Sequence, residues 1–303
     1  MNGVLIIDKP AGLTSHDVVN RARRLLHERS IGHLGTLDPM ATGVLPLVTG
    51  SLTRLAQFYT KSEKIYEGTI RFGFATDTYD AEGEPTTAAQ EVRLNAEEVE
   101  ALAARFRGVI QQTPPPFSAK KINGVPAYKL ARQKKEVVLK PAPVEIKEFL
   151  ILAVEKDRAR FRARVASGTY MRSVAHDMGR ELACGGHLES LRRTAVAEFN
   201  LEDAHTLEEL AEAAGTPETL EALFVHPRKL LPQLPSVTAD EPTAARIHSG
   251  RTVNLSDFSR ARQVKVFSSQ RDLIAIATRV AGTLFHPKIV LTTQPAEHCI
   301  RRK

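Results

Sequence analysis

The chain has 303 residues, 42% hydrophobic and 25% charged, which is ordinary for a globular protein with room for one large and one small domain. No apolar run approaches the ~18 residues of a membrane span, and Val4–Ile7, ended by Asp8, is too short for the apolar part of a signal peptide. Its two cysteines, Cys184 and Cys299, form no Cys-x-x-Cys pair. This pattern argues against a disulfide framework or a zinc site, and we expect a cytoplasmic protein.

The net charge of +7 is unevenly distributed along the chain. Lys120–Lys140 holds seven Lys/Arg against one Glu, and Ser236–Lys303 holds eleven Lys/Arg against five acidic residues, so that the remainder is net acidic. A basic surface can serve solubility alone. Two separate basic regions on an otherwise acidic chain favour a polyanionic partner, most simply a nucleic acid.

Apolar spacing predicts the elements of the N-terminal half. A helix is expected from Ser15, as its N-cap, to His27. A short buried strand, a helix, a strand of period two and an amphipathic helix follow in that order: Val44–Val48, Leu52–Tyr59, Ile65–Phe74 and Glu97–Phe106.

The C-terminal half begins with an irregular stretch, Gln111–Val144, which has three consecutive prolines and the first lysine-rich run. We predict a protruding loop or hairpin there. Two strands and a helix closed by Gly185 and Gly186 are expected next: Val144–Val154, Arg160–Ala166 and Arg172–Cys184. Two helices, a linker and three strands of a small β domain complete the chain: Leu207–Ala214, Glu218–Phe224, Pro227–Pro235, Val264–Phe267, Leu273–Thr278 and Ile289–Leu291.

One segment combines a single carboxylate with residues that dictate backbone shape. Gly32–Leu45 reads GHLGTLDPMATGVL, so Asp38 lies among three glycines and a proline. Glycine permits a positive φ or a close approach by another chain, and Pro39 disfavours helical backbone at Asp38. Such a composition is also typical of an ordinary surface turn. The shaping of the segment around one acid favours a catalytic role for Asp38.

This segment resembles the catalytic motif of the TruB family of tRNA pseudouridine synthases. Other segments resemble further motifs of that family and occur in the same order: Asp8–Ser15 (DKPAGLTS), Lys64–Gly68 (KIYEG), Thr76–Gly83 (TDTYDAEG), Ser167–Arg172 (SGTYMR) and Leu191–Arg193 (LRR).

The resemblance implies an α+β fold in which a mixed or antiparallel sheet of the pseudouridine-synthase type is flanked by helices over residues 1–232. It also implies an RNA-binding thumb loop at about 111–144, which includes Lys120 and Lys121. Residues 236–303 resemble, by position, charge and strand pattern, a small β-barrel-like RNA-binding domain of the PUA type.

The implied activity is conversion of a uridine in the tRNA T-loop, position 55 in the family, to pseudouridine after base flipping. It needs no cofactor and no metal. The implied partner is the T-arm of tRNA. We expect no protein partner, no membrane association and a monomer, since no exposed heptad or apolar helix suggests self-association.

The resemblance also assigns catalytic roles. Asp38 is the essential aspartate, either as the nucleophile or as the base that removes the C2′ proton; proton abstraction is our preferred interpretation, and the sequence leaves both open. Arg172 pairs with Asp38 and is expected to keep it ionised inside a closed pocket, by lowering its pKa against the effect of burial. Tyr66 stacks on the extruded base, and its phenol assists removal of the C5 proton.

Four further residues are implied to shape the substrate site. Leu191 closes its apolar wall, and His33 fills the gap left by the flipped nucleotide. Lys9 braces the catalytic loop, and Tyr170 packs beneath the site.

Other functions fit the same residues. One is a synthase acting on another RNA, such as a homologue that works with a guide RNA. Another is a tRNA-binding or folding protein whose role does not depend on catalysis, although an intact set of Asp38, Tyr66 and Arg172 argues against it. A hydrolase using Asp38 as nucleophile lacks an evident second acid.

Overall fold

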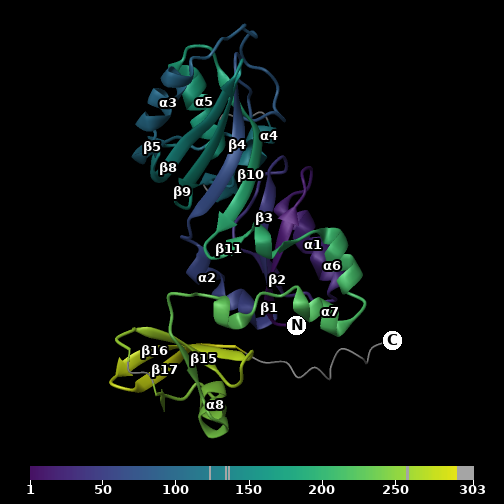
Figure 1. The fold of residues 1–303 in the computed structure, drawn as a ribbon, viewed down its shortest axis with the longest axis vertical. Coiled ribbons are helices and arrows are strands. Elements are labelled where there is room, and N and C mark those ends of the chain that lie inside the picture. The colour runs from purple at the N-terminus through teal and green to yellow at the C-terminus, as the bar shows by residue number, and fades with distance from the viewer. Residues whose placement is uncertain (123, 134, 136, 257–258, 292–303) are drawn as a thin grey trace.

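The computed structural model describes residues 1–291 apart from 123, 134, 136, 257 and 258. Within this range the chain forms a large sheet, a five-stranded sheet near the C-terminus and a two-stranded hairpin (Figure 1). Cys299 and the three basic residues that end the sequence lie outside the described range. None of the described helices is long and apolar enough to cross a membrane.

The large sheet has ten strands, eight of which follow the order β12–β1–β3–β10–β4–β9–β8–β5. The sheet is mixed, as predicted, because β1–β12 and β3–β10 are parallel and the other pairs are antiparallel. Two short strands lie off the path, where β2 pairs with β3 and β11 pairs with β10. In chain order the strands are β1 (Gly3–Lys9), β2 (Ile31–His33), β3 (Thr42–Thr49), β4 (Lys64–Phe72), β5 (Gly108–Gln112), β8 (Ala142–Glu155), β9 (Arg158–Val165), β10 (Gly186–Val196), β11 (Phe199–Asn200) and β12 (Ala204–His205).

The contact between β3 and β10 is short. It consists of two residue pairs, Arg192 with Thr42 and Arg193 with Gly43, and it joins the half of the sheet around β1 to the half around β4. Gly43 has φ 100°, and a Cβ there would lie 2.2 Å from the carbonyl oxygen of Arg193. Only glycine permits this approach.

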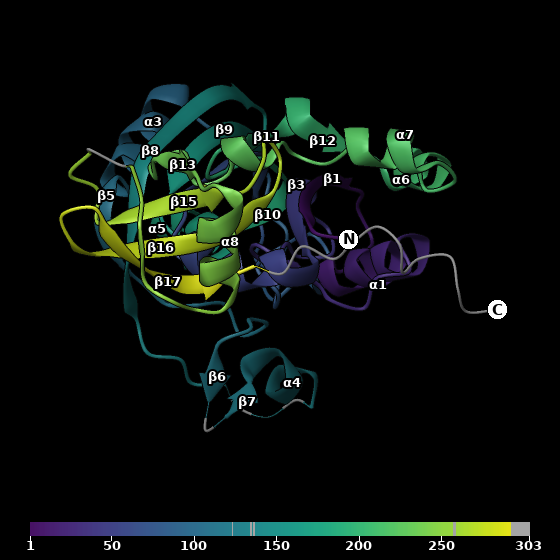
Figure 2. The same cartoon turned by 90° about the horizontal axis from the view of Figure 1, so that it is seen from below.

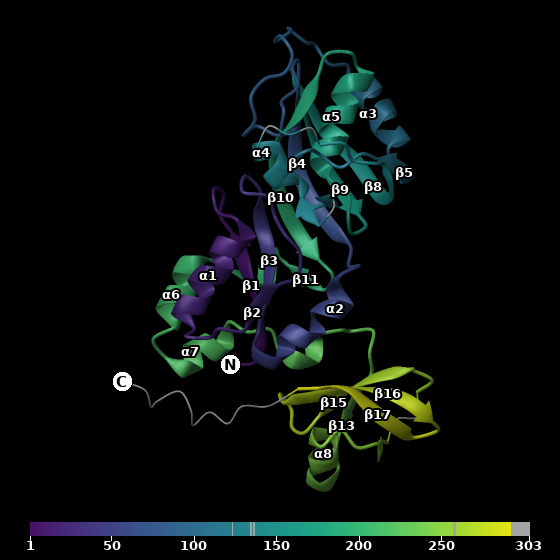
Figure 3. The same ribbon diagram turned by 180° about the vertical axis from the view of Figure 1, so that it is seen from behind.

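Two groups of helices cover one face of the large sheet, one group over each half (Figure 3). Buried residues of these helices and of the strands form a single hydrophobic cluster, which includes Val18, Leu45, Phe161 and Val174. The helices of the first half are α1 (Ser15–Leu25), α6 (Leu207–Ala213) and α7 (Pro217–Ala222), and those of the second half are α3 (Ala96–Arg105) and α5 (Met171–Glu181).

The predicted helices and strands are confirmed, mostly with small shifts at their ends, but one cap, one helix type and the start of the last strand, expected at Ile289 and found at Leu284, were wrong. Thr14, not Ser15, is the N-cap of α1, because its side chain and that of Asp17 form a capping box. The helix expected from Leu52 begins as a 3₁₀ helix, Gly50–Leu55, before α2 (Ala56–Tyr59).

Two central strands were not predicted. β1 is buried along almost its whole length and therefore lacks the alternation that marks a half-exposed strand. β10 carries His187 and Arg193, which are buried polar side chains in a run that reads as surface. Both strands lie beside the Asp38 loop, which we define as residues 34–41 between β2 and β3.

Residues 113–141, here called the thumb segment, leave the large sheet between β5 and β8 and project from the body (Figure 2). This confirms the predicted protrusion. The segment contains a hairpin, which is one of the two predicted alternatives, and a short helix that the sequence pattern did not indicate: β6 (Lys121–Ile122), β7 (Val125–Pro126) and α4 (Ala127–Arg132).

The C-terminal sheet has the order β13–β15–β16–β17–β14 and packs against the large sheet through a second hydrophobic cluster. Val44 of the large sheet, Leu230 of the linker and Phe267 of the C-terminal sheet all belong to this cluster. Lys265 is buried, and its Nζ donates to the carbonyl oxygens of Arg228 (2.9 Å) and Leu230 (2.6 Å). The elements are the linker 3₁₀ helix η3 (Pro227–Lys229), β13 (Ser236–Thr238), α8 (Glu241–His248), β14 (Val253–Asn254), β15 (Gln263–Phe267), β16 (Leu273–Ala281) and β17 (Leu284–Val290).

Candidate active site

The Asp38 loop is tied to the start of α1. The backbone N–H of Gly12 donates to the carbonyl oxygen of Pro39 (2.9 Å). The hydroxyl of Ser15 accepts from the N–H of Leu37 (2.8 Å) and donates to the carbonyl oxygen of the same residue (3.2 Å). The Ser15 side chain therefore binds both backbone polar groups of Leu37, the residue before Asp38.

Lys9 holds the other side of the loop. Its side chain is fully buried, and Nζ donates to the carbonyl oxygens of Pro10 (2.8 Å), Pro39 (3.1 Å) and Ala41 (2.7 Å). Burial lowers the pKa of Lys9 to about 8, although the nearby Asp38 carboxylate acts in the opposite direction. The side chain is thus still mostly charged at neutral pH, and it is placed to orient the loop.

Arg193 is a second buried cation that serves the same loop. Its guanidinium donates from Nε to the carbonyl oxygen of Val44 (2.8 Å), from Nη1 to that of Thr36 (3.2 Å) and from Nη2 to that of Gly35 (3.0 Å). Sequence reasoning missed this residue. The one available signal was its membership of the segment Leu191–Arg193.

Asp38 and Arg172 form an ion pair between the loop and the first turn of α5. Nη2 of Arg172 donates to Oδ1 of Asp38 (2.9 Å), and Nε lies 2.9 Å from Oδ2. The Arg172 side chain is 5% exposed, while that of Asp38 is 33% exposed. The arginine is therefore a buried support, and part of the carboxylate is accessible from outside.

The Arg172 guanidinium has three further partners. It donates to the carbonyl oxygens of Thr78 (3.2 Å) and Phe117 (3.1 Å), and Nη1 lies 3.5 Å from Oδ2 of Asp80. Asp80 is buried, and its Oδ1 accepts from the hydroxyl of Thr78 (2.5 Å). One arginine is thus shared by two carboxylates. Asp80 was noted only as part of a motif, and its role was missed.

Two opposed effects set the pKa of Asp38. Burial raises the pKa of the Asp38 carboxyl above its ordinary value, and the nearby Asp80 carboxylate adds to this effect. Arg172 and Lys9 act in the opposite direction, as predicted for Arg172, but burial outweighs them. The predicted direction of the Arg172 effect is confirmed, and the pKa of Asp38 lies above its ordinary value because burial has the larger effect.

Tyr66 and Leu191 lie on neighbouring strands next to this group. Tyr66 of β4 pairs with Arg193 of β10, and Leu191 pairs with Gly68 two residues further along β4. Tyr66 and Leu191 are each 8% exposed and belong to the same hydrophobic cluster. The structure therefore places the predicted aromatic and apolar side chains on the strand pair β4–β10, next to Arg193, whose guanidinium binds the Asp38 loop.

His33 and Tyr170 flank the site. His33 ends β2, and its Nδ1 accepts from the N–H of Gly35 (3.3 Å); burial and Arg193 lower the pKa of His33, which keeps it neutral at pH 7. Tyr170 is the N-cap of α5 and exchanges two hydrogen bonds between its backbone and the side chain of Gln112 (2.8 and 3.1 Å). It holds the helix start that carries the arginine.

Lys120 and Lys121 are exposed and lie in the thumb segment, and no contact between them and the Asp38 ion pair is found among the described residues. The base of the same segment reaches the site through the carbonyl oxygen of Phe117, which accepts from Arg172. The thumb segment is therefore connected to the ion pair by one direct hydrogen bond.

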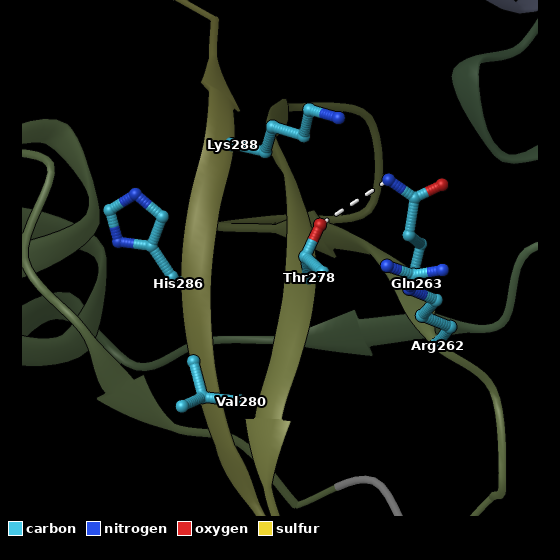
Figure 4. A pocket seen from close by; sticks show the side chains of 6 residues that line it. All are labelled: Arg262, Gln263, Thr278, Val280, His286 and Lys288. Atoms are coloured by element: carbon cyan, nitrogen blue, oxygen red, sulfur yellow. Dashed lines mark hydrogen bonds between the residues drawn. The ribbon is translucent and has the colours of Figure 1, made fainter.

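Away from the Asp38 loop, a hollow of about 610 Å³ lies on the C-terminal sheet (Figure 4). The side chains of Arg262, His286 and Lys288 line it beside Gln263, whose Nε2 donates to the hydroxyl of Thr278 (3.3 Å). The hollow thus has two cations, Arg262 and Lys288, beside neutral hydrogen-bonding groups. Such a face is suited to binding the anionic backbone of a nucleic acid.

The groups at the Asp38 site suit acid–base or nucleophilic chemistry. A partly accessible carboxylate with a raised pKa can accept a proton or attack carbon, and the buried arginine stabilises its charged form. Among the described residues, no group of three or more His, Cys, Asp or Glu side chains is arranged to hold a metal ion.

Comparison with known proteins gives matches to one family over nearly the whole chain. Residues 23–171 match the model of the TruB family pseudouridylate synthase N-terminal domain, and residues 172–230 match that of the tRNA pseudouridylate synthase B C-terminal domain. A protein named tRNA pseudouridine synthase B from Solibacter usitatus is 51% identical over 294 residues, which cover 96% of this chain and 100% of the relative. One of the same name from Aquifex aeolicus is 38% identical over the same shares of both chains.

Solved structures show the same fold. The archaeal box H/ACA sRNP Nop10–Cbf5 complex contains a chain with a TM-score of 0.69 and 23% identity, covering 95% of this chain and 86% of that one. At this identity the likeness concerns the fold, including the C-terminal sheet. The family models and the full-length relatives establish the narrower relation: the chain belongs to the TruB family of pseudouridylate synthases.

Proposed function

We propose that this chain isomerises a uridine in the T-loop of tRNA, position 55 in the family, to pseudouridine, and that Asp38 performs the chemistry. As a TruB-family member it is a pseudouridine synthase, an isomerase acting on tRNA. The observation that carries the proposal for Asp38 is its ion pair with the buried Arg172, which leaves a third of the carboxylate side chain exposed.

The reaction needs no group from outside the substrate. Asp38 takes the C2′ proton, the N1–C1′ electrons leave with the uracil, and a C1′=C2′ double bond forms. After the uracil turns, C5 bonds to C1′ and the proton returns from Asp38 to C2′; loss of the C5 proton and protonation of N1 complete the isomerisation. The raised pKa of Asp38 supports proton abstraction, because a base is most effective when its pKa approaches the working pH.

The detached uracil must be retained while it turns. Tyr66 offers a ring for stacking, its phenol is a candidate for the C5 proton, and Leu191 supplies an apolar wall; their adjacent positions on β4 and β10 support these roles. The neutral imidazole of His33, at the edge of the site, is suited to occupy the space that the flipped nucleotide leaves.

Extruding the uridine costs about a few kcal/mol, which contacts elsewhere on the RNA must offset. Lys120 and Lys121 of the thumb segment and Arg262 and Lys288 of the C-terminal sheet are placed on separate surfaces for phosphate contacts. We assign residues 1–232 to catalysis and 236–303 to RNA binding, and we propose that the enzyme acts as a monomer without a protein partner.

Tritium release from tRNA transcripts with uridine tritiated at C5 tests the proposal. Wild type should release tritium, a transcript with cytidine at position 55 should release none, and Asp38→Asn should bind tRNA without releasing tritium. Asp157→Asn, which alters a surface ion pair with Arg71, is the matched control and should remain active.

Release by Asp38→Asn would refute the role of Asp38. Release that persists with cytidine at position 55 would move the substrate to another uridine or another RNA. Tight binding by wild type with no release would instead favour a tRNA-binding or folding protein. Light scattering of the purified enzyme tests the monomer.

A further inference from the structure

Tyr79 occupies a backbone conformation that needs an explanation. Its φ is 65°, in the left-handed region that a residue with a Cβ adopts only when its surroundings compensate. The residue lies in the turn Thr76–Gly83, where its N–H donates to the carbonyl oxygen of Thr76 (3.3 Å) and its carbonyl oxygen accepts from the N–H of Leu188 in β10 (3.0 Å). Glycine would adopt this φ without strain, so we expect a stabilising contact made by the tyrosine side chain.

The side chain of Tyr79 stacks on His176 of α5. The two ring centroids lie 3.8 Å apart and the planes differ by 11°. Burial and the neighbouring Arg180 cation lower the pKa of His176, so a neutral ring faces the tyrosine at pH 7. The stack therefore connects the turn to the helix without placing another positive charge there.

This stack lies one helical turn from the arginine of the active site. Arg172 and His176 are four residues apart in α5 and consequently lie on the same side of the helix. Arg172 donates to the carbonyl oxygen of Thr78, the residue before Tyr79, and Nη1 lies 3.5 Å from the carboxylate of Asp80, the residue after it. Three consecutive residues of the turn thus contact two consecutive turns of the helix.

We propose that the stacked pair Tyr79–His176 is a positioning contact that holds the turn Thr76–Gly83 on α5, so that Thr78 and Asp80 fix the guanidinium that orients Asp38. Neither ring reacts. The inference rests on the proposed role of Asp38, and it adds that the left-handed tyrosine controls the geometry of the ion pair. Binding of tRNA by the basic surfaces is independent of it.

Four variants separate the ring from the backbone. Tyr79→Phe keeps the stack and removes the hydroxyl. Tyr79→Gly removes the ring but suits φ 65°, so the fold should be retained. His176→Ala removes the partner ring at a helix position that favours alanine, and the double variant Tyr79→Gly/His176→Ala tests whether the two rings act as one unit.

We expect Tyr79→Phe to keep kcat for tritium release within about twofold of wild type, and Tyr79→Gly and His176→Ala each to lose about tenfold in kcat, or ~1.4 kcal/mol, with KM within about twofold. The double variant should be no slower than the slower single variant. Thermal melting of each variant, well above the assay temperature, shows that the fold is retained. If Tyr79→Gly melts near the assay temperature, the kcat of His176→Ala alone tests the inference.

Full kcat in both Tyr79→Gly and His176→Ala would overturn the inference. So would an equal loss in Tyr79→Phe, which would assign the effect to the hydroxyl, or a raised KM with unchanged kcat, which would assign it to RNA contact. Wild type and Asp38→Asn, assayed alongside, show separately whether the proposed function itself holds.

Discussion

Replacing Arg193 with lysine tests whether the buried guanidinium holds the Asp38 loop. The three N–H groups that reach the carbonyl oxygens of Gly35, Thr36 and Val44 lie on different corners of the guanidinium. A lysine ammonium is a compact point charge and cannot span the same three acceptors. Loss of two charge-assisted hydrogen bonds, at about 1.5 kcal/mol each, predicts a decrease of ~3 kcal/mol in the free energy of unfolding.

The neighbouring arginine provides the control. Arg192 is 42% exposed and pairs with Asp8 (2.7 Å), and its Nη1 also donates to the hydroxyl of Thr42 (3.3 Å). Arg192→Lys should lower the free energy of unfolding by at most about 1 kcal/mol, as is usual for an exposed ion pair. Urea unfolding measures both variants. Tritium release from tRNA should show a decrease of at least about tenfold in kcat for Arg193→Lys, because a small displacement of a reacting group is costly.

Equal stability losses in the two variants would contradict this prediction, since the buried guanidinium of Arg193 has three carbonyl acceptors to lose and the exposed Arg192 has a partly solvated ion pair. A stable Arg193→Lys protein with full kcat would show that the loop is held by its other contacts alone.

Further predictions concern charge. Asp80→Asn removes a carboxylate that raises the pKa of Asp38, so the acidic limb of the kcat–pH profile should move to lower pH; an unchanged limb would contradict the coupling. Lys9 has its pKa lowered to about 8 from 10.5; the unfolded chain therefore binds more protons between these values, and the stability of wild type relative to Lys9→Met should rise with pH there, by at most about 1.4 kcal/mol per pH unit. A flat difference between pH 8 and 10.5 in urea unfolding would contradict it. Lys120→Ala/Lys121→Ala should raise KM for tRNA and reduce its salt dependence while kcat is kept, and an unchanged salt slope would exclude phosphate contacts there.

The sequence was most informative where a single residue or a local pattern decides the outcome. The helices near Glu97 and Arg172 were predicted because their apolar residues recur at helical spacing, and the thumb segment because its prolines and lysines leave no core-forming pattern. Asp38 and Arg172 were identified by resemblance, and the structure brings them into contact.

The remainder depends on partners far apart in the chain. Arg193 appears in the sequence as one of two adjacent arginines. Only the fold shows that Arg193 is buried against carbonyl groups about 150 positions earlier, while Arg192 is partly exposed and pairs with Asp8. The contribution of Asp80 to the raised pKa of Asp38 was missed for a related reason, because the sequence around Asp38 does not show that the two carboxylates lie close together. Thr14 and not Ser15 caps the helix, and the hydroxyl of Ser15 instead accepts a hydrogen bond from the N–H of Leu37.

The two-residue contact between β3 and β10 has a consequence for how the enzyme can lose activity. Thr42 and Gly43 follow directly on the Asp38 loop, and their partners Arg192 and Arg193 follow directly on Leu191. The strand pairing that joins the two halves of the sheet is thus continuous in sequence with the catalytic residues. If heat, denaturant or a distant mutation weakens the packing between the two halves, this two-residue pairing should break early. Loss of activity should therefore precede global unfolding, and it would measure how firmly the two halves of the sheet are held together.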